Sequence, residues 1–167
     1  CTDCRRYWSE LRAGNITQAD YDSMESAIYR SPGHCMVMGT ASTMGAIVET
    51  LGMSLPGGAV VPGADSRRKI LAEESGRTAV DLVSKGIRPS SILTTDAFDN
   101  AIRILLASGG STNAIIHLIA IAGRAGITLD LDRFNALSES TPVIVNLKPG
   151  GKYLMEDLFY AGGVEAV

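Results

Sequence analysis

Only one segment of this sequence has the composition of a β-strand, which restricts the folds open to the chain. Residues 143–147 form a β-branched, apolar run that is typical of a buried strand. Helical patterns dominate the rest of the sequence. We therefore expect an α/β fold: a mostly helical fragment of a layered α/β domain, with few parallel strands and most of its sheet elsewhere.

The helices are predicted from apolar spacing and from capping signals. Thr17 begins a segment that resembles a capping box, Thr94 or Thr95 caps a later helix, and Gly86 is placed to end one. The expected helices cover residues 4–13, 17–30, 40–51, 66–85, 95–107, 114–124, 131–137 and 153–160.

Two of these helices have patterns that predict how they pack. Residues 66–85 are amphipathic, with one face formed by Leu71, Ala79, Leu82 and Val83. Residues 114–124 are apolar nearly all round, so this helix should be buried, with His117 as a hydrogen-bonded histidine of the core.

The composition excludes several classes of protein. A length of 167 residues is enough for one domain with a sizeable core, and 46% hydrophobic with 20% charged residues argues against disorder. The net charge of −3, with scattered Lys and Arg, and an aromatic content of 5% give no indication of nucleic-acid binding. The longest apolar run, within residues 114–123, is too short to span a bilayer.

The most informative side chain is Cys35. It follows a Pro32-Gly33 turn and precedes an apolar helix, so the turn should expose the sulfur and the helix start should favour a thiolate, the form that binds metals. One cysteine cannot hold a metal cluster, which indicates part of an enzyme. The alternative, that Cys35 is simply a small buried apolar residue, stays open because most free cysteines are of that kind. We expect His34 either at the surface or in contact with a metal ligand rather than with the metal itself.

A zinc site is a second interpretation of the cysteines. Cys1 and Cys4 form a CxxC motif, and Cys35 with His34 could complete a tetrahedral set. The adjacency of His34 and Cys35 argues against it, since neighbours rarely point at one ion. Three cysteines without a secretory signal favour a reduced, cytoplasmic setting.

Two glycine-containing loops are candidate ligand sites. In the first, Ser111, Thr112 and Asn113 follow a glycine pair and begin a helix, where free N–H groups can bind a carboxylate or phosphate. The alternative is that these residues are ordinary helix caps. In the second, the loop that follows Ser54 could approach a ligand closely or could be a simple turn.

Several blocks resemble the dihydroxy-acid and sugar-acid dehydratase family, in order over essentially the whole chain. They are residues 33–44 (GHCMVMGTASTM), 51–57 (LGMSLPG), 65–68 (DSRR), 98–102 (FDNAI), 109–114 (GGSTNA), 155–158 (MEDL) and 161–163 (AGG). The opening residues 7–14 (YWSELRAG) are more similar to the sugar-acid (pentonate) branch than to the branched-chain amino-acid branch.

The resemblance implies an iron–sulfur hydro-lyase that removes water from a 2,3-dihydroxy acid to give a 2-keto acid. It implies that Cys35 is one of three cysteine ligands of a 2Fe–2S or 4Fe–4S cluster. It also implies a Mg²⁺ site and a serine base outside these residues, so no catalytic residue is assigned within them. Ser111, Thr112, Asn113 and Ser54 then become candidate substrate-binding residues.

We therefore expect residues 1–167 to be part of the N-terminal, cluster-binding domain of a longer dehydratase, inactive alone. The expected reaction converts an aldonic sugar acid to a 2-keto-3-deoxy acid, in a cytoplasmic homo-oligomer (dimer or tetramer) that binds neither nucleic acid nor membrane. Two alternatives remain: a dihydroxy-acid dehydratase of branched-chain amino-acid synthesis, and a helical interaction module without chemistry.

Overall fold

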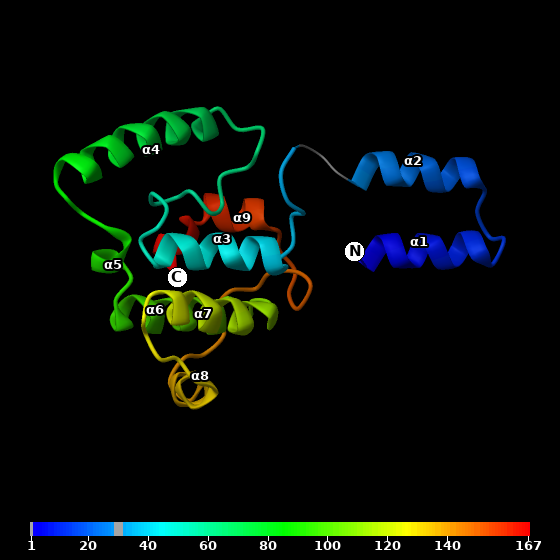
Figure 1. The fold of residues 1–167 in the computed structure, drawn as a ribbon. Helices are drawn as coiled ribbons and strands as arrows, with labels where there is room; N and C mark the ends of the chain where they lie inside the picture. The colour runs from blue at the N-terminus through cyan, green and yellow to red at the C-terminus, as the bar shows by residue number, and fades with distance from the viewer. Residues whose placement is uncertain (1, 29–31) are drawn as a thin grey trace. The chain divides into compact units, whose positions relative to one another are not determined.

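The computed structural model describes residues 2–28 and 32–167, and the chain divides into two compact units, Cys1–Gly33 and His34–Val167. The first unit is a pair of helices, α1 (Thr2–Arg12) and α2 (Gln18–Ile28), which pack against each other (Figure 1). The rings of Trp8 and Tyr21 meet edge to face, with centroids 5.8 Å apart.

The capping box predicted at the start of α2 is confirmed. The Thr17 N–H donates to Asp20 Oδ2 at 2.9 Å, and the Asp20 N–H donates to Thr17 Oγ1 at 3.2 Å. The Thr17 hydroxyl also donates to Asp20 Oδ2 at 2.7 Å, and this bond, together with the one from the Thr17 N–H, lowers the pKa of the Asp20 carboxyl below its usual value.

The second unit is also helical. Its elements, labelled in Figure 1, are α3 (Thr40–Thr50), α4 (Arg67–Ser84), α5 (Pro89–Ile92), α6 (Thr95–Ala107), α7 (Asn113–Arg124), α8 (Leu131–Ser138), α9 (Met155–Tyr160) and the 3₁₀ helix η1 (Gly163–Ala166). Most of the predicted helices are confirmed; the short α5 and η1 were not predicted. Among the described residues, no helix has both the length and the apolar character to cross a membrane.

Helix α3 is the centre of this unit because it contributes to two apolar clusters. Ile47 faces α6, α7 and α8, in a cluster completed by Leu51, Phe98, Ala101, Ile102, Leu105, Ala114, Leu118, Ala122, Phe134 and Leu137. Ala46 faces the other way, in a cluster with Met38, Ala59, Val60, Leu147, Met155 and Leu158. Figure 1 shows α3 between α9 and the α6–α7 pair, and its residues on opposite sides account for this position.

Two helix ends follow the capping signals in the sequence. Thr94 is the N-cap of α6, and its hydroxyl accepts the Ala97 N–H at 3.2 Å. After α4, Gly86 has φ +67°, and the Ile87 N–H reaches back to the Leu82 carbonyl at 3.0 Å. Both predictions are confirmed.

The strand predicted over residues 143–147 is wrong for the part of the chain described here. The segment is extended, but it forms only one isolated bridge, from Leu147 to Tyr153, and Val143 is 67% exposed. A strand needs a partner, and the N–H groups of Ile144 and Val145 instead share the Ala107 carbonyl at the end of α6. The mostly helical content is confirmed, and the predicted layering is not seen in residues 2–28 and 32–167.

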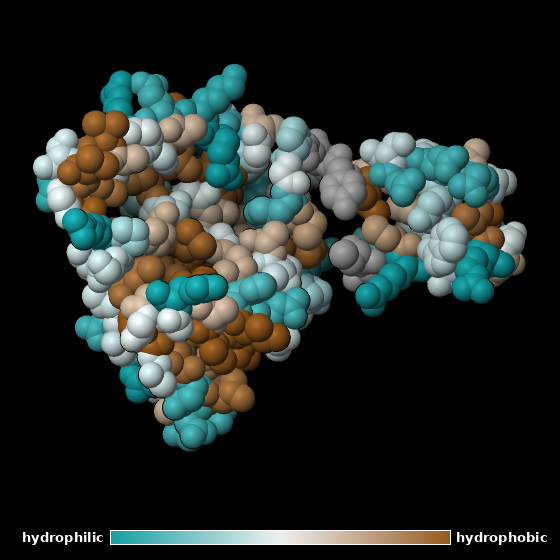
Figure 2. Space-filling view, in the orientation of Figure 1, coloured by the Kyte–Doolittle hydropathy of each residue, from teal (hydrophilic) through white to brown (hydrophobic). Residues whose placement is uncertain are grey.

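The predicted burial of helix α7 is also wrong. Helix α7 buries only Ala114, Leu118 and Ala122, a single face, so Ile116 is 70% exposed and His117 is exposed rather than a core histidine. Helix α4 has no buried residue, and its Val83 is 81% exposed. Figure 2 shows apolar side chains at the surface over one end of α4 and beside α7. Apolar periodicity predicted the helices but not whether neighbours would cover them.

Candidate functional site

Cys35 lies in a loop that is anchored by the C-terminal part of the second unit. The Met36 carbonyl accepts the Met155 N–H at 2.9 Å, and the Met38 N–H donates to the Lys148 carbonyl at 2.8 Å. Cys35 is a free, half-buried thiol. Its sulfur would lie 3.9 Å from a Cβ added at Gly39, the N-cap of α3, which has no side-chain cap. The thiol is therefore beside the start of a helix, where a negative charge is favoured.

Two side chains hold this loop in place: Ser42, in the first turn of α3, and His34, in the loop itself. Ser42 Oγ donates to the Val37 carbonyl at 2.8 Å and lies 3.2 Å from His34 Nδ1. The same His34 nitrogen lies 2.8 Å from the carbonyl of Cys35. The carbonyls of Cys35 and Val37 are thus linked, through His34 and Ser42, to the first turn of α3.

The start of α7 meets the start of α3 at the same end of that helix. Thr40 Oγ1 accepts the Asn113 side-chain N–H at 3.0 Å and lies 2.9 Å from Ser111 Oγ. Thr43 Oγ1 accepts the Ser111 N–H at 3.0 Å and donates to the Gly39 carbonyl at 2.8 Å. The structure therefore brings Ser111 and Asn113 to the end of α3 that carries Cys35.

The other two predicted substrate-binding residues are placed differently. Thr112 is exposed at the N-cap of α7 and makes no side-chain cap. Ser54 lies beyond the C-terminal end of α3, with its hydroxyl donating to the Leu55 carbonyl at 3.4 Å. Because the 11 residues of α3 rise about 1.5 Å each, Ser54 is on the order of 15 Å from the Cys35 end. The structure does not bring Ser54 together with Cys35.

Three polar residues of α3 were missed by the sequence reasoning. Ser42, Thr43 and Glu49 are buried with 0%, 1% and 9% exposure. Glu49 accepts the N–H groups of Gly57 and Ala59 at 2.9 and 2.7 Å, and so shapes the loop after the helix. Polar side chains inside an apolar helix were the signal available, since such groups are buried only when hydrogen-bonded.

The side chains that the structure describes do not form a complete metal site. Among the described residues, no group of three or more His, Cys, Asp or Glu side chains could hold a metal ion. Cys4 is on α1 of the first unit, and Cys1 lies outside the described residues, so the zinc interpretation gains no support from the structure. Cys35, half-buried at a helix start, is chemically suited to supply one thiolate.

Two of the sequence blocks noted above form ion pairs with structural roles. In residues 65–68, the pKa of Asp65 is lowered to about 2 by hydrogen bonds from Arg67, whose guanidinium also lies 4.4 Å from the ring centre of Phe159 on α9. In residues 98–102, Asp99 on α6 pairs with Arg133 on α8, which lowers the pKa of the Asp99 carboxyl. The Asp99–Arg133 pair and the contact of Arg67 with Phe159 each connect segments far apart in the sequence.

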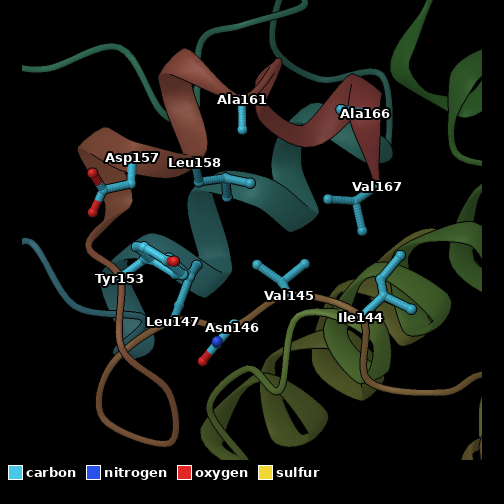
Figure 3. A pocket seen from close by; sticks show the side chains of 10 residues that line it. All are labelled: Ile144, Val145, Asn146, Leu147, Tyr153, Asp157, Leu158, Ala161, Ala166 and Val167. Carbon is cyan, nitrogen blue, oxygen red and sulfur yellow. The ribbon is translucent and has the colours of Figure 1, made fainter.

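An open pocket of about 380 Å³ lies elsewhere, near the C-terminus (Figure 3). It is lined by the extended segment 144–147, by Tyr153, by α9 residues and by the last residues of the chain, and Figure 3 shows Val145, Leu158 and Val167 around it. Asp157 is the one acidic side chain in the lining, and none of the predicted site residues is there.

The comparisons with known proteins agree with the sequence blocks. The chain is 54% identical over 157 residues to L-arabinonate dehydratase from Rhizobium leguminosarum, covering 94% of this chain and 27% of that protein. It is 45% identical over 166 residues to 6-deoxy-6-sulfo-D-gluconate dehydratase from Pseudomonas putida (99% and 29%), and 49% identical over 154 residues to dihydroxy-acid dehydratase from Sulfurisphaera tokodaii (92% and 28%). The chain thus spans between a quarter and a third of the length of these relatives. The profile described as dihydroxy-acid/6-phosphogluconate dehydratase N-terminal matches residues 1–167, and the chain belongs to that family.

Proposed function

We propose that the full-length protein is a dehydratase that converts an aldonic sugar acid to a 2-keto-3-deoxy acid. The observation that carries this is the match to two sugar-acid dehydratases, at 54% and 45% identity over nearly the whole chain. The reaction removes the C2 proton and the 3-hydroxyl as water, which leaves an enol that becomes the 2-keto acid.

In this proposal Cys35 is one of three thiolate ligands of an iron–sulfur cluster. When bound, such a cluster would supply a Lewis acid for the departing hydroxyl. The contribution of this chain is to hold the sulfur. The loop is fixed by the Met36 and Met38 backbone bonds and lies beside the N-terminal end of α3.

Ser111, Thr112 and Asn113 are the substrate-side residues of the proposal. Ser111 and Asn113 are fixed through Thr40 at the Cys35 end of α3, and Thr112 is exposed next to them. The start of α7 would bind the substrate carboxylate or hydroxyls through hydroxyl and amide groups. Ser54 lies at the other end of α3, so it would contact the substrate only if the substrate-binding site extended along that helix.

Further parts of the proposal concern the full-length protein. The Mg²⁺ site and the base would come from outside the described residues. Residues 143–147, which are extended and form only the Leu147–Tyr153 bridge here, would join a parallel sheet of a layered α/β domain to which residues 1–167 belong. The enzyme would be a cytoplasmic homo-oligomer.

The experiment is a substrate panel with the full-length protein, purified without oxygen. We expect 2-keto acid, trapped as its semicarbazone, from L-arabinonate or another aldonate. The 49% identity to a dihydroxy-acid dehydratase favours a second candidate, a branched 2,3-dihydroxy acid as substrate. Preference for 2,3-dihydroxyisovalerate by more than tenfold in kcat/KM would replace the sugar-acid assignment with this one, and no 2-keto acid from any of them would contradict the proposal.

A further inference from the structure

Ser42 is a fully buried hydroxyl next to the loop that carries Cys35. It is 0% exposed, and burial of a hydroxyl is costly unless its hydrogen bonds are made. Its Oγ donates to the Val37 carbonyl at 2.8 Å and has a second partner, His34 Nδ1, at 3.2 Å. Both contacts of this side chain go to the loop.

The hydrogen bonds of His34 follow from its partners. The Cys35 carbonyl, 2.8 Å from Nδ1, can only accept a hydrogen bond, so Nδ1–H is the donor in this contact. The same hydrogen is shared with Oγ of Ser42 at 3.2 Å, whose own hydroxyl proton goes to the Val37 carbonyl. The result is a continuous series of hydrogen bonds from the Cys35 carbonyl through His34 and Ser42 to the Val37 carbonyl.

We propose that Ser42 and His34 are positioning residues for Cys35. The two side chains fix the carbonyl of Cys35 and that of Val37, two residues later, to the rigid first turn of α3. The direction of the thiol is thereby set before any ligand binds. The role of this positioning, to present the thiol to a metal, rests on the proposed function. The positioning itself is a property of the metal-free protein and can be tested there.

The test is the reactivity of Cys35 in the metal-free full-length protein. Iodoacetamide labelling is followed by mass spectrometry of the peptide that contains Cys35, with the Cys4 peptide as an internal reference. In Ser42→Ala and in the exposed-site variant His34→Ala, we expect Cys35 to be labelled about fivefold faster, because the loop that carries this half-buried thiol loses hydrogen bonds to its backbone and opens more often. The Cys4 rate should not change.

Two variants separate positioning from general destabilisation. His34→Asn keeps an N–H donor near the place of Nδ1 and should restore slow labelling. Thr50→Ala removes a comparable hydroxyl, which bonds the Ala46 carbonyl at 2.8 Å in the last turn of the same helix, and should leave Cys35 labelling within twofold of wild type.

The holoenzyme gives a second readout, the rate of iron loss to a chelator, which should rise in Ser42→Ala and His34→Ala. Labelling rates within twofold of wild type in both variants would overturn the inference and leave the proposed function intact. Full iron content in Cys35→Ser would instead contradict the proposed function, and the labelling rates would still decide the positioning.

Discussion

Gly110 is the position where one added methyl group should disturb the contact between α3 and α7 most directly. A Cβ there would lie 2.8 Å from Thr43 Cγ2 and 2.9 Å from Leu105 Cδ1, closer than carbon atoms approach without displacement. Thr43 cannot move freely, because its hydroxyl bonds both the Gly39 carbonyl and the Ser111 N–H. Leu105 is 6% exposed and packed in the larger core cluster.

The loss of stability expected in Gly110→Ala follows from these two close contacts. Overpacking by one methyl group costs about 1–3 kcal/mol. If Thr43 rotates away, the bond to the Ser111 N–H is lost as well, at roughly 1 kcal/mol. We therefore expect the free energy of unfolding to fall by about 2–4 kcal/mol.

Urea unfolding followed by circular dichroism measures this change, with Gly76→Ala as the matched control. Gly76 lies within α4 with nothing within 4 Å of an added Cβ, so its substitution should stabilise by about 0.5–1 kcal/mol through helix propensity. A loss below about 0.5 kcal/mol in Gly110→Ala would refute the reasoning, since it would mean that Thr43 and Leu105 yield at almost no cost.

Three further predictions concern caps, burial and pH. Thr94→Ala removes the hydroxyl that accepts the Ala97 N–H and should destabilise by about 1 kcal/mol in urea unfolding. Leu118→Ala, at a side chain with 0% exposure, should cost about 2–5 kcal/mol, whereas Ile116→Ala, at one with 70% exposure on the same helix, should cost less than about 0.5 kcal/mol; equal costs would contradict the packing of α7. The folded-state pKa of Asp65 is about 2, below the ordinary value of 3.8, so the unfolded chain takes up this proton first as the pH falls. Wild type should therefore lose stability between pH 4 and pH 2 more steeply than Asp65→Asn, as measured by urea midpoints, and identical slopes would contradict the assignment.

The sequence predicted what depends on neighbours along the chain. The capping box at Thr17, the cap at Thr94 and the glycine end at Gly86 involve contacts within a few residues, so local chemistry determines them. Cys35 was expected at a helix start, and it lies beside the N-cap of α3.

Contacts between residues far apart in the sequence could not be predicted from local patterns. Whether residues 143–147 pair as a strand depends on a partner that the local pattern does not reveal, and whether His117 is buried depends on which face of α7 meets α3 and α6. The contacts of Thr40 with Ser111 and Asn113 join residues about seventy positions apart. Ser42 was overlooked because a serine in a helix is ordinary until its partners are known.

The most direct test of the account is the iron content of Cys35→Ser in the full-length protein, purified without oxygen beside wild type and Cys4→Ser. A cluster held by three thiolates loses most of its affinity with one of them, so Cys35→Ser should lose its iron and its 2-keto acid formation, while Cys4→Ser keeps both. Iron and turnover at wild-type levels in Cys35→Ser would contradict the central claim.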